Sequence, residues 1–130
     1  MRQVQMNETI KNARITSTRL GIESHGILTA FILLDLEGGS AQGFGGYQFD
    51  YNPCSGRVYV PQGSHFIRRV LDVVGVDNWE DLPGTPCRIK RITRGDQICC
   101  LGNFIEDKWF NPIEEFKRYH DGDENDAEEL

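Results

Sequence analysis

The chain has no apolar run close to the roughly 20 residues that cross a bilayer as a helix. Its first residues, Met1-Arg2-Gln3-Val4-Gln5, also lack the apolar centre of a signal peptide. We therefore expect a cytoplasmic protein. A chain of 130 residues is short for two domains, so we predict a single domain over residues 1–120.

Histidine and the common catalytic motifs are also scarce. The chain holds three histidines and no His-x-x-x-His, Gly-x-Ser-x-Gly or Gly-x-x-x-x-Gly-Lys-Ser/Thr pattern, so the sequence offers no zincin helix, nucleophile elbow or P-loop. Gly43-Phe44-Gly45-Gly46 is not followed by a βαβ unit, which a dinucleotide fingerprint requires. We predict a protein that is not an enzyme, with no catalytic residues, no cofactor and no metal site.

The four cysteines form no Cys-x-x-Cys pair. Because successive strand residues point to opposite faces, we expect Cys99 and Cys100 to point apart. We interpret the cysteines as reduced and mostly buried, not as a disulfide framework or a zinc site.

An excess of basic residues is lacking too. The 20 acidic residues outnumber the 14 basic ones, and six of the acids lie in residues 121–130. Without those six, 14 acids face 14 bases, so the body of the protein is neutral. We expect residues 121–130 to form a disordered acidic tail, with mimicry of nucleic acid as the alternative. A neutral body argues against binding to long nucleic acid, which requires a broad basic face.

What the sequence does contain is a β-rich first half. Residues 10–20 alternate and include β-branched side chains, which predicts a strand. Residues 27–34 are apolar on both faces apart from Thr29, which predicts a strand covered on both sides, by two layers of one domain or by a helix and a second subunit. We therefore expect a homo-oligomer.

Helical periodicity begins after Gly63. Apolar residues recur at helical spacing up to Val74, Ser64 is a candidate N-cap and Gly75 a candidate C-cap. We predict a single turn at 77–82, a hairpin of strands 87–92 and 97–104, and a last helix over 112–119 with Ile113, Phe116 and Tyr119 on or near one face. The fold class is α+β: an antiparallel sheet of about five or six strands, one main amphipathic helix and a short C-terminal helix.

The segment 38–47 holds five glycines and precedes two aromatic residues. In a regular strand Gly43 and Gly45 would share a face with Tyr47, Phe49 and Tyr51. Bare backbone next to aromatic rings could seat a planar ligand. The alternative is that the glycines allow a helix or a second subunit to pack closely.

Two further clusters could serve a small anionic ligand. Arg88, Lys90, Arg91 and Arg94 lie near the second hairpin, where such residues are usually solvated. The segment 107–112 places Lys108 beside Trp109 and Phe110. These side chains either hold the last helix in place or line a pocket.

Four stretches resemble a family of small phage-encoded proteins, the first-described class of Thoeris anti-defence proteins. The likeness runs over about residues 10–112 and rests on residues 17–28, 43–47, 66–82 and 108–110. The resemblance implies a sponge in the host cytoplasm that captures a cyclic ADP-ribose isomer, made by a bacterial TIR-domain enzyme, without cleaving it. It also implies association with cyclic oligonucleotides and formation of oligomers.

We therefore predict a pocket in which a base stacks on an aromatic ring while basic side chains and glycine amides hold the diphosphate. A protein–protein inhibitor of a host defence or restriction system, or a small hydrolase or lyase, would be the alternatives. The predicted ligand-binding residues are Arg19, His25, Gly43, Phe44, Gly45, Gly46, Tyr47, Arg91, Lys108 and Trp109.

Overall fold

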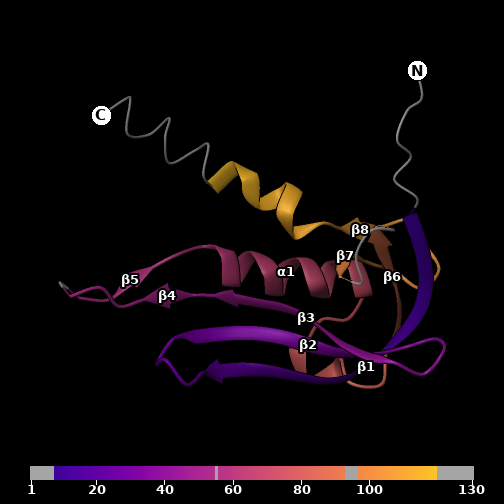
Figure 1. Cartoon of the computed structure of the whole chain (residues 1–130), viewed down its shortest axis with the longest axis horizontal. Coiled ribbons are helices and arrows are strands. Elements are labelled where there is room, and N and C mark those ends of the chain that lie inside the picture. The colour runs from indigo at the N-terminus through magenta and orange to yellow at the C-terminus, as the bar shows by residue number, and fades with distance from the viewer. Residues whose placement is uncertain (1–7, 55, 93–96, 120–130) are drawn as a thin grey trace.

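The protein is an α+β fold in which a curled antiparallel sheet is covered on one face by helices (Figure 1). The computed structural model describes residues 8–54, 56–92 and 97–119. The labelled elements are β1 (Glu8–Ile22), β2 (Leu28–Leu36), β3 (Ala41–Gln48), β4 (Asp50–Tyr51), β5 (Val58–Tyr59), α1 (Gln62–Val74), the 3-10 turn η1 (Trp79–Asp81), β6 (Pro86–Ile92), β7 (Ile98–Gly102) and β8 (Trp109–Phe110). A last helix covers residues 112–119.

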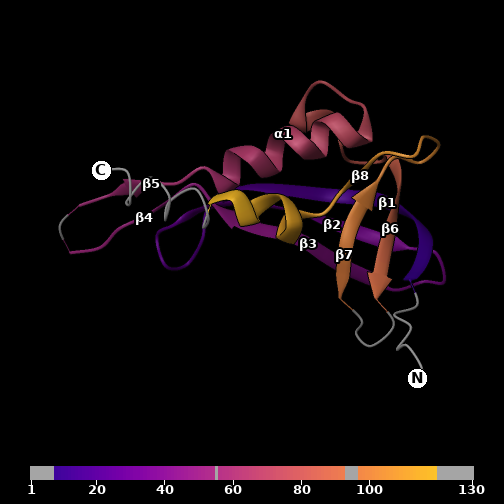
Figure 2. The ribbon, with the colours of Figure 1, turned by 90° about the horizontal axis from the view of Figure 1, so that it is seen from above.

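Six strands form the main sheet in the order β3-β2-β1-β6-β7-β8, while β4 and β5 pair separately. The 15-residue β1 pairs with β6 through its first half and with β2 through its second. A bulge lies between Ile15 and Ser17, and a bulge bends the strand that carries it. Figure 2 shows β6 and β7 running steeply across the direction of β2 and β3, so the sheet curls about β1.

Helix α1 packs on the concave face of the sheet. Its buried residues Phe66, Val70 and Val73 meet a core that includes Ile15 and Ile32, all with no exposed surface. The helix ends as predicted at Gly75, whose left-handed backbone (φ 92°) lets its N–H donate to the carbonyl of Leu71.

The predicted N-cap at Ser64 is wrong. The N-cap is Pro61, three residues earlier, so the helix begins at Gln62, and no side chain caps it. Gly63 is buried in the first turn, where an added Cβ would lie 2.5 Å from the ring of Phe49. This contact places the start of the helix against the sheet, a constraint that the capping pattern does not contain.

The described residues of the same chain cover strand β2 on one face only, so the alternative in which two layers of one domain cover it is wrong, while cover by a helix and a second subunit stays a prediction. Ala30, Ile32 and Leu34 are fully buried, whereas Leu33 on the opposite face is 36% exposed. The second layer that its apolar sequence predicts is not supplied by the described residues of the same chain.

The cysteines are free, as predicted, with Cys87 and Cys100 buried and Cys54 exposed. The prediction that Cys99 and Cys100 point apart is wrong, since their Sγ atoms lie 3.4 Å from each other. Lys90 pairs with Cys100 and Arg91 with Ile98, so Cys99 is the extra residue of a bulge. An extra residue interrupts the alternation of side chains.

The turn 77–82, the hairpin of 87–92 and 97–104, and the last helix are confirmed in outline. Asn111 Oδ1 accepts from the N–H of Glu114 and caps that helix. Phe116 is buried, but Ile113 is 69% exposed and does not join the core. The predicted tail 121–130 and Arg94 of the basic cluster lie outside the described residues. No helix among the described residues is long and apolar enough to cross a membrane.

Candidate functional site

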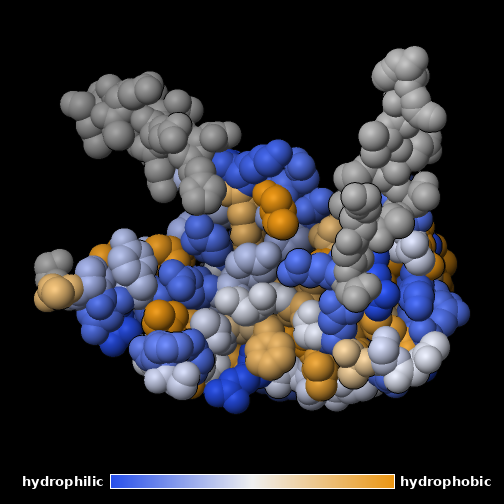
Figure 3. All heavy atoms as spheres, viewed as in Figure 1, coloured by the Kyte–Doolittle hydropathy of each residue, from blue (hydrophilic) through white to orange (hydrophobic). Residues whose placement is uncertain are grey.

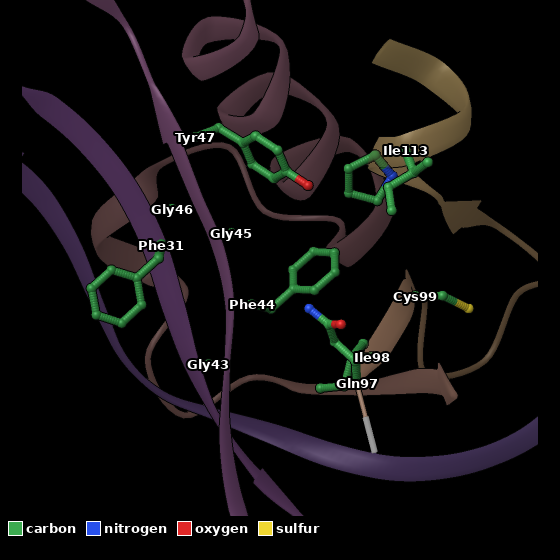
Figure 4. Close-up of a pocket in the computed structure, with 11 residues that line it drawn as sticks. Phe31, Gly43, Phe44, Gly45, Gly46, Tyr47, Gln97, Ile98, Cys99 and Ile113 are labelled. Carbon is green, nitrogen blue, oxygen red and sulfur yellow. The ribbon is translucent and has the colours of Figure 1, made fainter. Parts of the chain in front are cut away.

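A cavity of about 530 Å³ opens between β3 and β7, where the curled sheet does not close. One rim is the glycine-rich part of β3, and the other is formed by β7 and the start of the last helix (Figure 4). We call it the glycine pocket. Its lining residues are Phe31, Gly43, Phe44, Gly45, Gly46, Tyr47, Gln97, Ile98, Cys99, Pro112 and Ile113.

A β-bulge shapes the floor of the glycine pocket. Ala30 pairs with Tyr47 and Phe31 with Gly45, so Gly46 is an extra residue without a cross-strand partner in β2. Gly45 (φ 117°) and Gly46 (φ 86°) adopt backbone conformations that residues with a side chain rarely take. The bulge therefore depends on glycine at both positions.

The bulge also overturns the predicted alternation. A Cβ added to Gly43 would contact the ring of Phe31, whereas one added to Gly45 would meet Phe66 on the helix side. The two glycines therefore do not share a face, and the prediction that they do is wrong because a regular strand has no extra residue.

The glycines divide between the two roles that their sequence leaves open. An added Cβ at Gly45 would lie 2.5 Å from Cζ of Phe66, so Gly45 is needed for α1 to pack. At Gly46 an added Cβ would meet nothing within 4 Å, and at Gly43 its nearest neighbours lie at 3.8 Å. Gly43 and Gly46 are thus the positions where another molecule can approach the backbone.

The two predicted aromatic residues of β3 differ in accessibility. Phe44 is buried, with its ring centroid 5.9 Å from that of Phe66. Tyr47 is half-buried and meets Phe116 edge to face, with centroids 4.8 Å apart. Burial raises the pKa of Tyr47, so its hydroxyl keeps its proton at neutral pH and can donate a hydrogen bond. Tyr47 is therefore the better placed of the two to contact a ligand.

Of the predicted cations, Arg91 is tied to the strand that floors the pocket. Its Nη2 lies 3.4 Å from Oε1 of Gln42, the residue before Gly43. The Nε of Arg91 is buried and has no hydrogen-bond partner among the described residues. A buried donor without a partner is costly, and an anionic acceptor could reduce that cost.

Arg19 and His25 lie outside the glycine pocket. Arg19 is exposed on β1, where it pairs with Phe31, a lining residue, and its Nη2 donates to the carbonyl of Ile22. His25 is exposed in the β1–β2 turn, with Nδ1 3.2 Å from Oε2 of Glu23. The N–H of Gly26 donates to the carbonyl of Glu23 and closes this turn.

Lys108 and Trp109 are held away from the pocket by other contacts. Lys108 Nζ donates to the carbonyl of Asp72 near the end of α1. The ring of Trp109 lies so close to Gly102 that a Cβ there would overlap it, and Lys90 Nζ stands 4.3 Å from the ring centroid. Among the described residues, the structure therefore brings together the β3 residues, leaves Arg91 and Arg19 near them and places His25, Lys108 and Trp109 elsewhere.

A polar network missed by the sequence-based reasoning holds the last helix in place. Glu115 Oε1 accepts from Arg69 Nε at 3.0 Å and lies 2.8 Å from His65 Nε2, while His65 Nδ1 lies 2.6 Å from the Tyr119 hydroxyl. Arg69 Nη2 also donates to the carbonyl of Trp109. Because Pro112 and Ile113 line the glycine pocket, this network positions one of its walls. The side chains at 65, 69 and 115 lie up to 50 residues apart along the chain, and only their helical spacing could have hinted at a shared face.

A second cavity of about 510 Å³ adjoins the first. It shares Gly46, Tyr47 and Ile113 with the glycine pocket and is also lined by Gln62 and Lys117. The exposed side chain of Ile113 thus stands between two cavities. Comparison with protein-family models, with curated proteins and with solved structures finds no match for this chain.

Proposed function

We propose that this protein binds a small nucleotide in the glycine pocket and holds it without cleaving it. The observation that carries the proposal is the bare floor of the pocket, where Gly43 and Gly46 leave the backbone of β3 open beside the half-buried ring of Tyr47. The volume lies within the roughly 300–1,000 Å³ of small-molecule sites. A base can stack on an aromatic ring there while phosphate oxygens accept from backbone amides.

The ligand that we propose is a cyclic ADP-ribose isomer, with cyclic oligonucleotides as further candidates, as the resemblance to the anti-defence sponges implies. Arg91 is the cation best supported for its diphosphate, because its guanidinium lies beside Gln42, the residue before Gly43 in β3. Binding without cleavage is supported by the lining itself. None of the eleven described lining residues is a histidine or a carboxylate, the usual general acids and bases.

Such a sponge would act in the host cytoplasm by lowering the free concentration of an immune signal. Stoichiometric capture requires tight binding, and a nanomolar Kd corresponds to about −12 kcal/mol. The partner that we propose for the exposed face of β2 is a second copy of the chain, because Phe31 and Leu33 leave apolar surface there. Light scattering of the purified protein tests this oligomer.

The test of ligand binding is calorimetry with a panel of cyclic ADP-ribose isomers and cyclic dinucleotides. We expect one member to bind with a nanomolar Kd, and we expect mass spectrometry to recover it intact after the protein is denatured. Gly43→Val should weaken binding at least about tenfold, or about 1.4 kcal/mol, because the new side chain fills space beside Phe31 in the pocket lining. Gly21→Val is the matched control, since an added Cβ there meets nothing within 4 Å.

The proposal fails if no member of the panel binds, or if the recovered ligand is chemically altered. The second of these results would indicate a hydrolase or lyase. If Gly43→Val and Gly21→Val bind the ligand equally well, the ligand binds outside the glycine pocket.

A protein–protein inhibitor is the second candidate. The end of the molecule that carries the β1–β2 and β4–β5 hairpins favours this function. Exposed apolar side chains gather on the β1–β2 and β4–β5 hairpins, including Ile22, Val58 and Tyr59. Figure 3 shows hydrophobic groups at the left end, where Figure 1 places β4 and β5. If the acidic tail engages the target, deletion of residues 121–130 should abolish inhibition, whereas a sponge without the tail should still capture its ligand.

A further inference from the structure

The bulge in β7 brings two thiols together. Cys99 Sγ and Cys100 Sγ lie 3.4 Å apart, although neighbouring side chains of a regular strand point to opposite faces. Cys99 is partly exposed at the wall of the glycine pocket, and Cys100 is buried. In Figure 4 the sulfur of Cys99 points away from Phe44 and Tyr47.

The spacing of the sulfurs suits a bridging atom better than a direct bond. A disulfide needs its sulfurs at about 2.0 Å and its Cα atoms usually at about 4.4–6.8 Å, whereas Cα atoms of adjacent residues are held about 3.8 Å apart. Two sulfur bonds of about 2.3 Å, the length of a zinc–thiolate bond, span 3.4 Å with an angle of about 95° at the central atom.

The sulfur–atom–sulfur angle of about 95° and the number of available ligands distinguish a zinc ion from a trivalent arsenic or antimony centre as the bridging atom. A structural zinc ion needs four tetrahedral ligands, and the described residues contain no group of three or more His, Cys, Asp or Glu that could hold a metal ion. A trivalent centre with a lone pair, such as arsenic(III) or antimony(III), is pyramidal with bond angles near a right angle, and it prefers soft thiolate donors. Two thiols are enough to chelate it.

We propose that Cys99 and Cys100 form a dithiol site that captures trivalent arsenic or antimony compounds. With an organoarsenic oxide, each sulfur forms one bond to arsenic, the arsenic–oxygen bonds break, and the oxide leaves as water with the two thiol protons. Arsenic stays trivalent and no electrons are transferred. The partly exposed Cys99 reacts first, and the second step closes a ring with the neighbouring Cys100 inside the same molecule, where its effective concentration is high.

The test uses phenylarsine oxide and the full-length reduced protein. We expect intact-mass spectrometry to show one adduct per chain that survives excess glutathione, a monothiol, and is removed by dithiothreitol, a dithiol. Peptide mapping should place the adduct on the Cys99-Cys100 peptide. Cys99→Ser and Cys100→Ser should each leave only adducts that glutathione removes.

Cys54→Ser and Cys87→Ser are the matched controls and should retain the glutathione-resistant adduct. Because Cys100 is buried, circular dichroism must show that Cys100→Ser is folded, and Cys99→Ser carries the test if it is not. The inference is overturned if the resistant adduct persists in Cys99→Ser, or if the wild-type adduct is removed by glutathione. Neither result bears on nucleotide binding, which calorimetry measures independently.

Discussion

Phe44 and Phe110 meet edge to face with ring centroids 6.2 Å apart and an angle of 88° between their planes, although they belong to the two terminal strands of the sheet. The sheet therefore curls until the side chains of its ends touch while their backbones remain unpaired. The glycine pocket occupies this opening, with β3 on one side and β7 on the other. The curl of the sheet thus brings the side chains of β3 and β8 together in the core. Because the backbones of these two strands stay unpaired, the candidate site remains open.

The first prediction concerns the two kinds of glycine in β3. Gly45→Ala should lower the free energy of unfolding by about 2–4 kcal/mol, because it combines a positive φ with overlap of Phe66. The Cβ of Gly43→Ala would make only ordinary van der Waals contacts, so this variant should change the free energy of unfolding by less than about 1 kcal/mol. Urea denaturation of the two variants measures both values, and a similar loss in both would contradict the division of roles.

The second prediction compares neighbouring carboxylates of the last helix. Glu115→Ala removes the acceptor of Arg69 and the partner of His65, and we expect a loss of about 1–3 kcal/mol. Glu114→Ala removes only the exposed ion pair with Lys117 and should lower the free energy of unfolding by less than about 1 kcal/mol. Thermal unfolding of both proteins checks the difference, and equal melting temperatures would show that the network adds nothing.

The third prediction is a dependence of stability on acid. Burial acts to raise the pKa of Glu115, but hydrogen bonds from Arg69 and His65 outweigh it and lower the pKa below its ordinary value. The carboxylate therefore adds stability above the unfolded-state pKa of about 4.3 and loses it as the pH falls from there through the folded-state value. Wild-type protein and Glu115→Gln should differ in unfolding free energy at pH 7 and converge once the pH lies below the lowered folded-state pKa. A gap that stays constant with pH would exclude this origin.

The fourth prediction concerns thiol reactivity. Burial raises the pKa of Cys87 to about 12, which lowers its thiolate fraction about a thousandfold relative to an ordinary thiol near neutral pH. Cys54 is exposed, so iodoacetamide should label it in the native protein long before Cys87. Peptide mapping over time measures the two rates. Rapid labelling of Cys87 without denaturant would show that its region of the core opens easily.

Local patterns along the chain predicted most of the elements. Alternation predicted β1, helical spacing with Gly75 predicted α1 and its end, and the hairpin of β6 and β7 was predicted over residues 87–104. These signals depend on neighbours a few positions apart, so they can be obtained from sequence. The two bulges with extra residues Gly46 and Cys99 could not, because an extra residue is defined only by the strand opposite.

The sequence by itself determined an α+β chain with a neutral body, and it marked the glycine segment as the place where another molecule could approach the backbone. Only the tertiary structure decided which glycine serves which role. Gly45 is needed because Phe66 from α1 lies against it, while Gly43 and Gly46 remain open because the sheet does not close over them. Tertiary structure likewise separated Tyr47 from Trp109 and joined His65 to Glu115. Contacts between residues distant along the chain arise from the curl of the sheet, which local sequence patterns do not encode.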